Sequence, residues 1–186
     1  MNRILGLSTA AALSLVLALP ASAEPANLLG VFGNWSAYTT GTGSSLTCYA
    51  MSKPRAMRPA TAKRAKDVYL IVSDWPSRKV KAEPQIVYGY QAKEGAAASL
   101  GVGGDKFTFF IRNNGKEGSA WLQQLSDTPR LLTAMQEGVS AVATGTSGVG
   151  KKTIKTIDTY SLSGFNDAIA KVHAACDMQR VKSVHP

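Results

Sequence analysis

A glycine-rich stretch comes nearest to a catalytic motif in this chain. Residues 145–152 (GTSGVGKK) nearly match the phosphate-binding loop, in which a lysine contacts phosphates and the next residue, Ser or Thr, holds magnesium. Lys152 occupies the Ser/Thr position, and the β-branched residues 153–157 indicate a strand where that motif requires a helix. We therefore interpret the stretch as a glycine-rich connection between two strands.

The histidines and acidic residues form no recognisable catalytic pattern. A Ser-His-Asp triad needs a histidine base oriented by a carboxylate, but His173 falls beside an apolar helical stripe and His185 is the penultimate residue. No metal-ligand spacing is present, so we expect no metal and no cofactor. Because two acids distant in sequence could still hydrolyse a glycosidic bond, a small periplasmic hydrolase of cell-wall or glycan substrate remains an alternative function.

The chain contains two cysteines, Cys48 and Cys176. An even number of cysteines in an exported protein indicates a disulfide, because exported proteins fold in oxidising compartments. Two buried free thiols are the alternative. If the two residues are bonded, the bridge joins regions near opposite ends of the mature chain.

The N-terminus has the composition of a cleaved export signal. Arg3 provides a positive start, an apolar stretch follows, and small residues end at Ala23 before Glu24. The apolar run of about 16 residues is shorter than the roughly 20 that span a bilayer. No cysteine stands at the cleavage point for lipid attachment. We expect residues 1–23 to be removed, leaving a periplasmic or secreted protein with no transmembrane span.

Positive charge is concentrated in residues 53–81, although the whole chain carries a net charge of +9. Two acids accompany nine basic residues in this segment: Lys53, Arg55, Arg58, Lys63, Arg64, Lys66, Arg78, Lys79 and Lys81. A local positive surface attracts anionic partners, so these residues are a candidate surface for anionic lipid, lipopolysaccharide or host glycan. A solvated loop without a partner is the alternative. Residues 53–66 contain no aromatic residue to stack on bases, so we expect no nucleic acid partner.

The elements that position these residues are predicted to be mostly strands. Alternating or β-branched runs separated by Gly, Pro, Asn and Ser favour an antiparallel sandwich or barrel. The expected strands are residues 35–39, 46–51, 68–75, 86–91, 106–113, 119–122, 139–144 and 153–160. Asn114-Gly115 suits a tight hairpin turn. The mature residues 24–186 are enough for one domain with a hydrophobic core.

Two helices interrupt the strand pattern. The first begins at Thr128-Pro129 and ends at Glu137 before Gly138. The second is capped by Ser163, and its apolar stripe ends at Cys176, which therefore faces inward. A bond from Cys176 to Cys48 on an early strand would clamp this helix to the sheet.

Aromatic residues near these elements are interpreted as packing residues. Trp35, Trp75 and Trp121 are expected to anchor the core. The residues from Tyr160 to Phe165 are expected to form the junction between the last strand and the last helix, where Gly164 permits close approach.

Several short motifs together resemble one known family, the invasion-associated locus B proteins. The motifs are Thr146-Ser147-Gly148, residues 158–165 (DTYSLSGF), Ala168, Ile169 and Cys176 near the C-terminus, and Trp35, Cys48, Trp121-Leu122, Leu131-Leu132, Met135 and Gly138 before them. The resemblance covers most of the mature chain. It implies an exported protein of Gram-negative, mainly alphaproteobacterial, bacteria with an immunoglobulin-like β-sandwich and a Cys48–Cys176 pair. It implies no catalytic residues.

The sequence thus predicts a mainly β protein, an immunoglobulin-like antiparallel β-sandwich with one short and one C-terminal helix, stapled by a disulfide. The resemblance implies an association with invasion or virulence, although many family members look like proteins of free-living or plant-associated bacteria. We expect an exported, non-enzymatic interaction protein with a basic surface. A periplasmic chaperone-like module that binds extended peptides along an exposed sheet edge is a further alternative.

Overall fold

The structure is a computed structural model that describes residues 25–65, 67–115, 117–148 and 152–182. Side chains are described up to residue 177. The expected leader, Lys66 and His185 lie outside these residues, so the predictions made for them are not examined by the structure.

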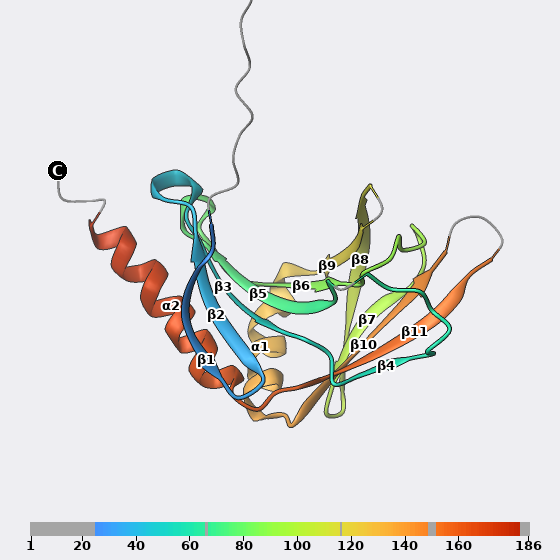
Figure 1. The fold of residues 1–186 in the computed structure, drawn as a ribbon. Helices are drawn as coiled ribbons and strands as arrows, with labels where there is room; N and C mark the ends of the chain where they lie inside the picture. Colours follow the sequence, from blue (N-terminus) through green and yellow to red (C-terminus); the bar gives the residue numbers. More distant parts are fainter. Residues whose placement is uncertain (1–24, 66, 116, 149–151, 183–186) are drawn as a thin grey trace, which may run out of the picture.

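The described residues include eleven strands, which form one antiparallel sheet (Figure 1). In chain order they are β1 (Asn27–Phe32), β2 (Trp35–Thr40), β3 (Thr47–Ser52), β4 (Ala56–Arg58), β5 (Tyr69–Trp75), β6 (Val80–Val87), β7 (Ala98–Val102), β8 (Asp105–Asn114), β9 (Glu117–Leu122), β10 (Ser140–Ser147) and β11 (Ile154–Ser161). Their order across the sheet is β1-β2-β3-β5-β6-β9-β8-β7-β10-β11-β4. Strand β4 therefore leaves its sequence neighbours β3 and β5 and pairs with β11 at the far edge.

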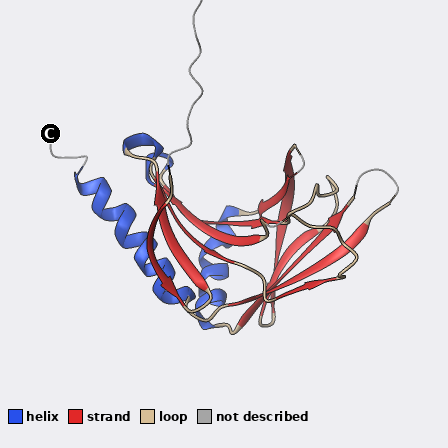
Figure 2. Cartoon of the chain, in the orientation of Figure 1, coloured by secondary structure: helices blue, strands red, loops and turns tan. Residues whose placement is uncertain are grey.

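The two helices cover neighbouring parts of the sheet, as Figure 2 shows, whereas β10, β11 and β4 form the other end. Helix α1 (Thr128–Glu137) contacts β6 and β7, and helix α2 (Phe165–Lys182) contacts β1, β2, β3 and β5. Alternate residues of the strands face α2, because successive side chains of a strand point to opposite sides. Those facing residues are fully buried: Trp35, Ala37, Cys48, Ala50, Leu70 and Val72.

The junction between β11 and α2 holds the β1–β2 turn in place. Gly164 has a φ of +89°, and a Cβ at this position would lie 1.9 Å from the carbonyl oxygen of Phe32. Trp35 Nε1 donates to the carbonyl oxygen of Ser161 at 2.9 Å, and its ring lies 4.9 Å from that of Phe165. The expected close approach at Gly164 is confirmed. Any larger residue there would collide with the turn.

The start of α2 differs from the prediction by one residue. The Gly164 carbonyl accepts the Ala168 N–H, so Gly164 occupies the capping position that the sequence assigned to Ser163. The Ser163 carbonyl instead accepts the N–H of Asn34 in the β1–β2 turn.

The disulfide between Cys48 and Cys176 is confirmed. Their Cα atoms are 5.9 Å apart, and the residues are separated by 128 positions in the sequence. Cys48 lies on β3 and Cys176 on the buried side of α2. The bond therefore fastens the last helix to an early strand, as predicted.

The predicted fold class is confirmed: a mainly β, antiparallel, sandwich-like protein with two helices and one disulfide. Helix α1 has the predicted limits, and its Leu131 and Met135 are buried. Trp35 is fully buried, whereas Trp75 and Trp121 are partly exposed on the opposite side of the sheet. Within the described residues, no helix is long and apolar enough to cross a membrane.

The predicted strand over residues 86–91 is wrong in its limits. Strand β6 begins at Val80 and ends at Val87, because Gly89 adopts a φ of +68° that interrupts the regular pairing. The chain stays beside β9, since the Tyr88 N–H donates to the Gly118 carbonyl and the Gly118 N–H donates to the Tyr90 carbonyl. The earlier part of β6 contains Pro84 and a positive φ at Ala82, and neither feature is typical of a strand. Strands β1, β4 and β7 were not predicted at all.

Candidate functional site

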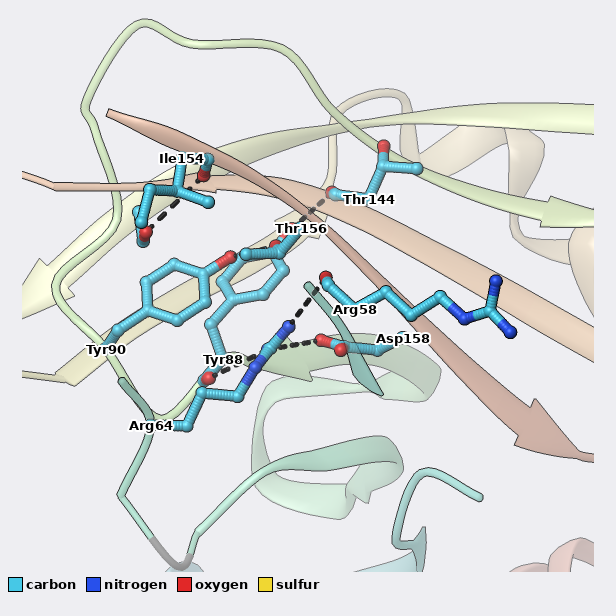
Figure 3. A network of polar contacts seen from close by, with 9 residues as sticks. Arg58, Arg64, Tyr88, Tyr90, Thr144, Ile154, Thr156 and Asp158 are labelled. Carbon is cyan, nitrogen blue, oxygen red and sulfur yellow. Dashed lines mark hydrogen bonds and ion pairs between the residues drawn. The ribbon is translucent and has the colours of Figure 1, made fainter. Parts of the chain in front are cut away.

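A buried ion pair joins the basic segment to the last strand (Figure 3). Arg64 Nη1 lies 2.7 Å from Asp158 Oδ2, and the two side chains are 5% and 0% exposed. Arg64 also donates to the carbonyl oxygens of Tyr88 and Arg58, at 3.5 Å and 3.4 Å. This arginine, one of the nine candidate surface residues, is therefore part of the interior.

Two tyrosines, Tyr88 and Tyr90, lie beside the ion pair. The rings of Tyr88 and Tyr90 stack at 5.2 Å, and the Arg64 guanidinium carbon lies 5.3 Å from the centre of the Tyr90 ring. Tyr90 shares a 2.5 Å hydrogen bond with Thr156, and Tyr88 donates to the carbonyl oxygen of Thr144 at 2.9 Å. The tyrosine hydroxyls thus attach the chain after β6 to strands β10 and β11.

Burial determines the proton affinities in this network. It raises the pKa of Asp158 above the usual carboxyl value, and the Arg64 charge opposes part of that rise. Burial also raises the pKa of Tyr90 to about 12, and it raises the pKa of Tyr88 and of Tyr160 further. The three tyrosines are therefore neutral at physiological pH, and Tyr88 and Tyr90 act as hydrogen-bonding groups.

The network anchors the basic segment and does not form an active site. Asp158 has no exposed surface, so a substrate has no access to its carboxylate. Its partner Arg64 comes from the segment between β4 and β5, and the Ala65 N–H donates to the Gly89 carbonyl at 2.6 Å beside it. These contacts hold the segment that precedes β5 against the β11 end of the sheet.

Apart from the buried Arg64, the seven remaining described residues of the basic set fall into two separate groups. Lys53, Arg55, Arg58 and Lys63 are exposed near the start of β5 and around β4, and Figure 3 shows the Arg58 side chain extending away from the Arg64 network. Arg78, Lys79 and Lys81 lie past the opposite end of β5. A charge run that is continuous in sequence is therefore not one surface.

The second group is largely engaged by its neighbours. The Arg78 guanidinium carbon lies 4.0 Å from the centre of the Trp75 ring. Lys81 pairs with Asp177 of α2 at 3.7 Å. These contacts give Arg78 and Lys81 local partners within the protein.

A pocket of about 410 Å³ opens where the chain leaves β3, on the side of the sheet opposite α2. We call it the tyrosine pocket, and the lining residues used below are Asn34, Ser36, Tyr38, Lys53, Arg55 and Tyr69. Lys53 Nζ lies 5.7 Å from the centre of the Tyr69 ring, and Tyr38 stacks on Tyr49 at 5.3 Å. The Arg55 N–H donates to the Thr159 carbonyl at 2.7 Å, which fixes the path of the chain at the rim.

A second pocket, of about 700 Å³, lies beside the β10–β11 hairpin. Lys63 and Lys152 both line it, together with Tyr90. Residues 145–147 of the glycine-rich stretch belong to β10 itself, and the stretch leads into the strand β11, as the sequence predicted, although residues 149–151 lie outside the described part. Lys152 was considered only as part of a catalytic motif, and its proximity to Lys63 was not foreseen.

The other titratable clusters have structural roles. His173 Nδ1 lies 2.7 Å from Asp74 Oδ2, which joins α2 to β5, and Asp74 Oδ1 accepts the Ala82 N–H at 2.8 Å. The predicted packing role of His173 beside the apolar stripe thus includes a polar contact. Across the described residues, no group of three or more His, Cys, Asp or Glu side chains is arranged to hold a metal ion.

The tyrosine pocket was missed by the sequence analysis, although a signal was present. Ser36 and Tyr38 alternate with buried Trp35 and Ala37, and Tyr69 alternates with buried Leu70. This alternation identifies side chains on the outer side of the sheet. Because β2, β3 and β5 are neighbours only in three dimensions, it does not show that these residues adjoin Lys53.

The fold is similar to that of a solved structure. It is the crystal structure of invasion associated protein B from Bartonella henselae, with a TM-score of 0.53 and 14% sequence identity over 78% of this chain and 96% of that chain. No family model matches the chain, and no curated protein matches it. At this identity the likeness concerns the fold, and it agrees with the fold that the sequence resemblance implied.

Proposed function

We propose that this chain is an exported, non-enzymatic interaction protein of the invasion-associated locus B type, whose single mature domain begins at residue 24. It works in the periplasm or outside the cell and presents a basic surface to an anionic partner. The partner is a lipid, a lipopolysaccharide or a host glycan. An association with invasion or virulence is part of the proposal and is supported by the description of the structural neighbour.

The observation that carries the proposal is a group of exposed cations around β4. We call Lys53, Arg55, Arg58 and Lys63 the β4 cations. All four side chains are exposed, and none has an ion-pair partner among the described residues. Cations that are not neutralised internally attract anions over a distance set by the ionic strength. The Arg64–Asp158 pair fixes the segment that carries Lys63.

Reversing three of the β4 cations is expected to abolish salt-sensitive binding to anionic supports. The variant Lys53→Glu/Arg55→Glu/Arg58→Glu should elute from heparin well before the wild-type protein and should no longer bind vesicles that contain phosphatidylglycerol. Side chains with this exposure tolerate substitution with little loss of stability. The measurement is the salt concentration at elution, together with vesicle cosedimentation at low and high salt.

The matched control reverses three exposed lysines elsewhere, Lys79, Lys106 and Lys171, which gives the same net charge. This control should keep most of the retention. If both triple variants lose retention equally, binding depends on net charge and not on the β4 cations. If the wild-type protein binds neither support, the proposed function is wrong.

The hydrolase alternative gains no support from the pockets. None of the four pockets described for this structure is lined by more than one carboxylate. Glycoside hydrolysis uses two carboxyl groups that flank the bond to be cleaved. We therefore prefer the non-enzymatic function.

One observation favours peptide binding as a second candidate function. The edge strand β1 has no charged residue. Its backbone pairs with β2 on one edge and with no described strand on the other edge. Leu28 and Val31 are 52% and 65% exposed. Edges of this kind can accept an additional strand. Binding of an extended apolar peptide that is lost in Leu28→Lys/Val31→Lys would support this function, and equal binding by the variant would contradict it.

A further inference from the structure

We infer that the tyrosine pocket binds one anionic sugar residue, such as a uronic acid or a sulfated pyranose. This inference rests on the proposed function and makes it more specific. It assigns the ligand to a defined pocket, and it gives Tyr38 and Tyr69 a role in recognising the sugar ring.

The walls of the pocket come from three parts of the chain that the fold holds rigidly. Tyr38 projects from β2 and Tyr69 from β5, on the side of the sheet opposite α2. Asn34 belongs to the β1–β2 turn, whose backbone is hydrogen bonded to Ser163. The pocket is thus formed largely before a ligand arrives, which reduces the entropy lost on binding.

The charge of the pocket selects an anion. Lys53 and Arg55 both line it, and no acidic residue does. Neither cation has an ion-pair partner among the described residues. A guanidinium donates paired hydrogen bonds to carboxylate or sulfate oxygens, and an ammonium adds a point charge. Together they complement a single acidic substituent.

The remaining lining residues suit a ring with many hydroxyl groups. Ser36 and Asn34 provide a hydroxyl and an amide, which can each donate and accept hydrogen bonds. The partly exposed rings of Tyr38 and Tyr69 offer faces of negative electrostatic potential, which attract the weakly positive C–H groups of a sugar ring.

The size and polarity of the pocket distinguish a sugar from a lipid. A volume of about 410 Å³ is within the range of small-ligand pockets. A surface that enters a membrane would present a cluster of large aliphatic side chains or tryptophan at its tip, whereas this pocket is lined mainly by polar and aromatic side chains, with Met51 and Pro54 as its apolar lining residues. The carbohydrate is therefore the occupant that these residues fit.

The test is calorimetric titration of the mature protein with a sulfated heparin-derived tetrasaccharide at low salt. Tyr69→Leu keeps an apolar side chain on β5 but removes the ring, and Tyr69→Phe keeps the ring and removes the hydroxyl. We expect affinity to fall about tenfold in Tyr69→Leu and in Lys53→Ala/Arg55→Ala, and to change less than about threefold in Tyr69→Phe. Thermal unfolding of each variant verifies that it is folded.

A charge-matched double variant, Lys106→Ala/Lys171→Ala, removes two exposed cations outside the pocket and should bind nearly as well as the wild-type protein. If Tyr69→Leu binds like the wild-type protein, or if the charge-matched control weakens as much as Lys53→Ala/Arg55→Ala, the pocket inference is overturned and a diffuse basic surface remains. Binding to phosphatidylglycerol vesicles without binding to the tetrasaccharide also overturns it while leaving the proposed function intact. Failure to bind either probe contradicts both.

Discussion

Replacing both cysteines, in the variant Cys48→Ala/Cys176→Ala, is expected to lower the free energy of unfolding by about 4 to 5 kcal/mol. The bond closes a loop between residues 128 positions apart, so its loss gives the unfolded chain a large gain in conformational entropy. Both sulfurs belong to buried residues, and alanine leaves no unsatisfied polar group in their place. Urea unfolding of the oxidised wild-type protein and of the variant, followed by circular dichroism, measures the difference.

The control for this measurement is dithiothreitol. It should destabilise the wild-type protein by a similar amount and should leave the double variant unchanged. A loss of less than about 1 kcal/mol would mean that the packing of α2 alone holds the helix, and that the bond adds little constraint.

The substitution Arg64→Met is expected to cost about 3 to 5 kcal/mol at neutral pH. It leaves the Asp158 carboxylate buried without its cationic partner, and methionine cannot donate to the carbonyl oxygens that Arg64 now contacts. The predicted readout is a lower urea midpoint together with faster proteolysis of residues 53–68. Lys63→Met, a neighbouring exposed lysine, is the matched control and should change stability by less than about 0.5 kcal/mol.

The pH dependence of Arg64→Met separates loss of charge from loss of packing. Because burial raises the pKa of folded Asp158, the folded state binds this proton more tightly than the unfolded chain. The contribution of Asp158 to the free energy of unfolding therefore falls as the pH rises from the pKa of Asp158 in the unfolded chain towards its higher pKa in the folded protein. Arg64 lowers the pKa of Asp158, so its removal raises the folded pKa and widens the pH range over which stability falls. The difference in stability between Arg64→Met and the wild-type protein should therefore become smaller at acidic pH.

A second substitution provides an independent check. In Arg64→Met/Asp158→Leu, two apolar side chains replace the ion pair, and most of the lost stability should return. If the double variant is as unstable as Arg64→Met alone, the unpaired carboxylate is not the cause of the loss.

Local patterns predicted the elements whose residues alternate clearly. The strand around Phe107 and Phe109 and helix α1 both follow from neighbouring residues, and the structure has them. Strands β8 and β9 do pair as neighbours, but Asn114, which was predicted as a turn residue, is still part of β8 and pairs with Glu117. The disulfide was predictable because two cysteines in an exported protein allow one intramolecular pairing. The limits of β6 could not be predicted, because Pro84 and the positive φ of Ala82 interrupt the regular pattern of a strand.

Properties that depend on distant residues were not accessible from the sequence. Arg64 and the other basic residues of its segment have the same local character, and its partner Asp158 lies 94 positions away. Strand β4 has three residues, all exposed, so only its pairing with β11 identifies it. The sequence therefore indicated where positive charge is concentrated, but the fold determines which of those charges face the solvent.

The path of residues 53–68 also affects how the domain can fold. Strands β3 and β5 are neighbours in the sheet, yet the chain between them must reach β11, and Trp35 is hydrogen bonded to Ser161, 126 positions later. Contacts of such long range slow folding, since loop-closure entropy is lost before they form. Both the first strands and the crossing segment depend on residues near the C-terminus. We therefore expect that a growing chain cannot complete this fold until β11 and α2 have been made.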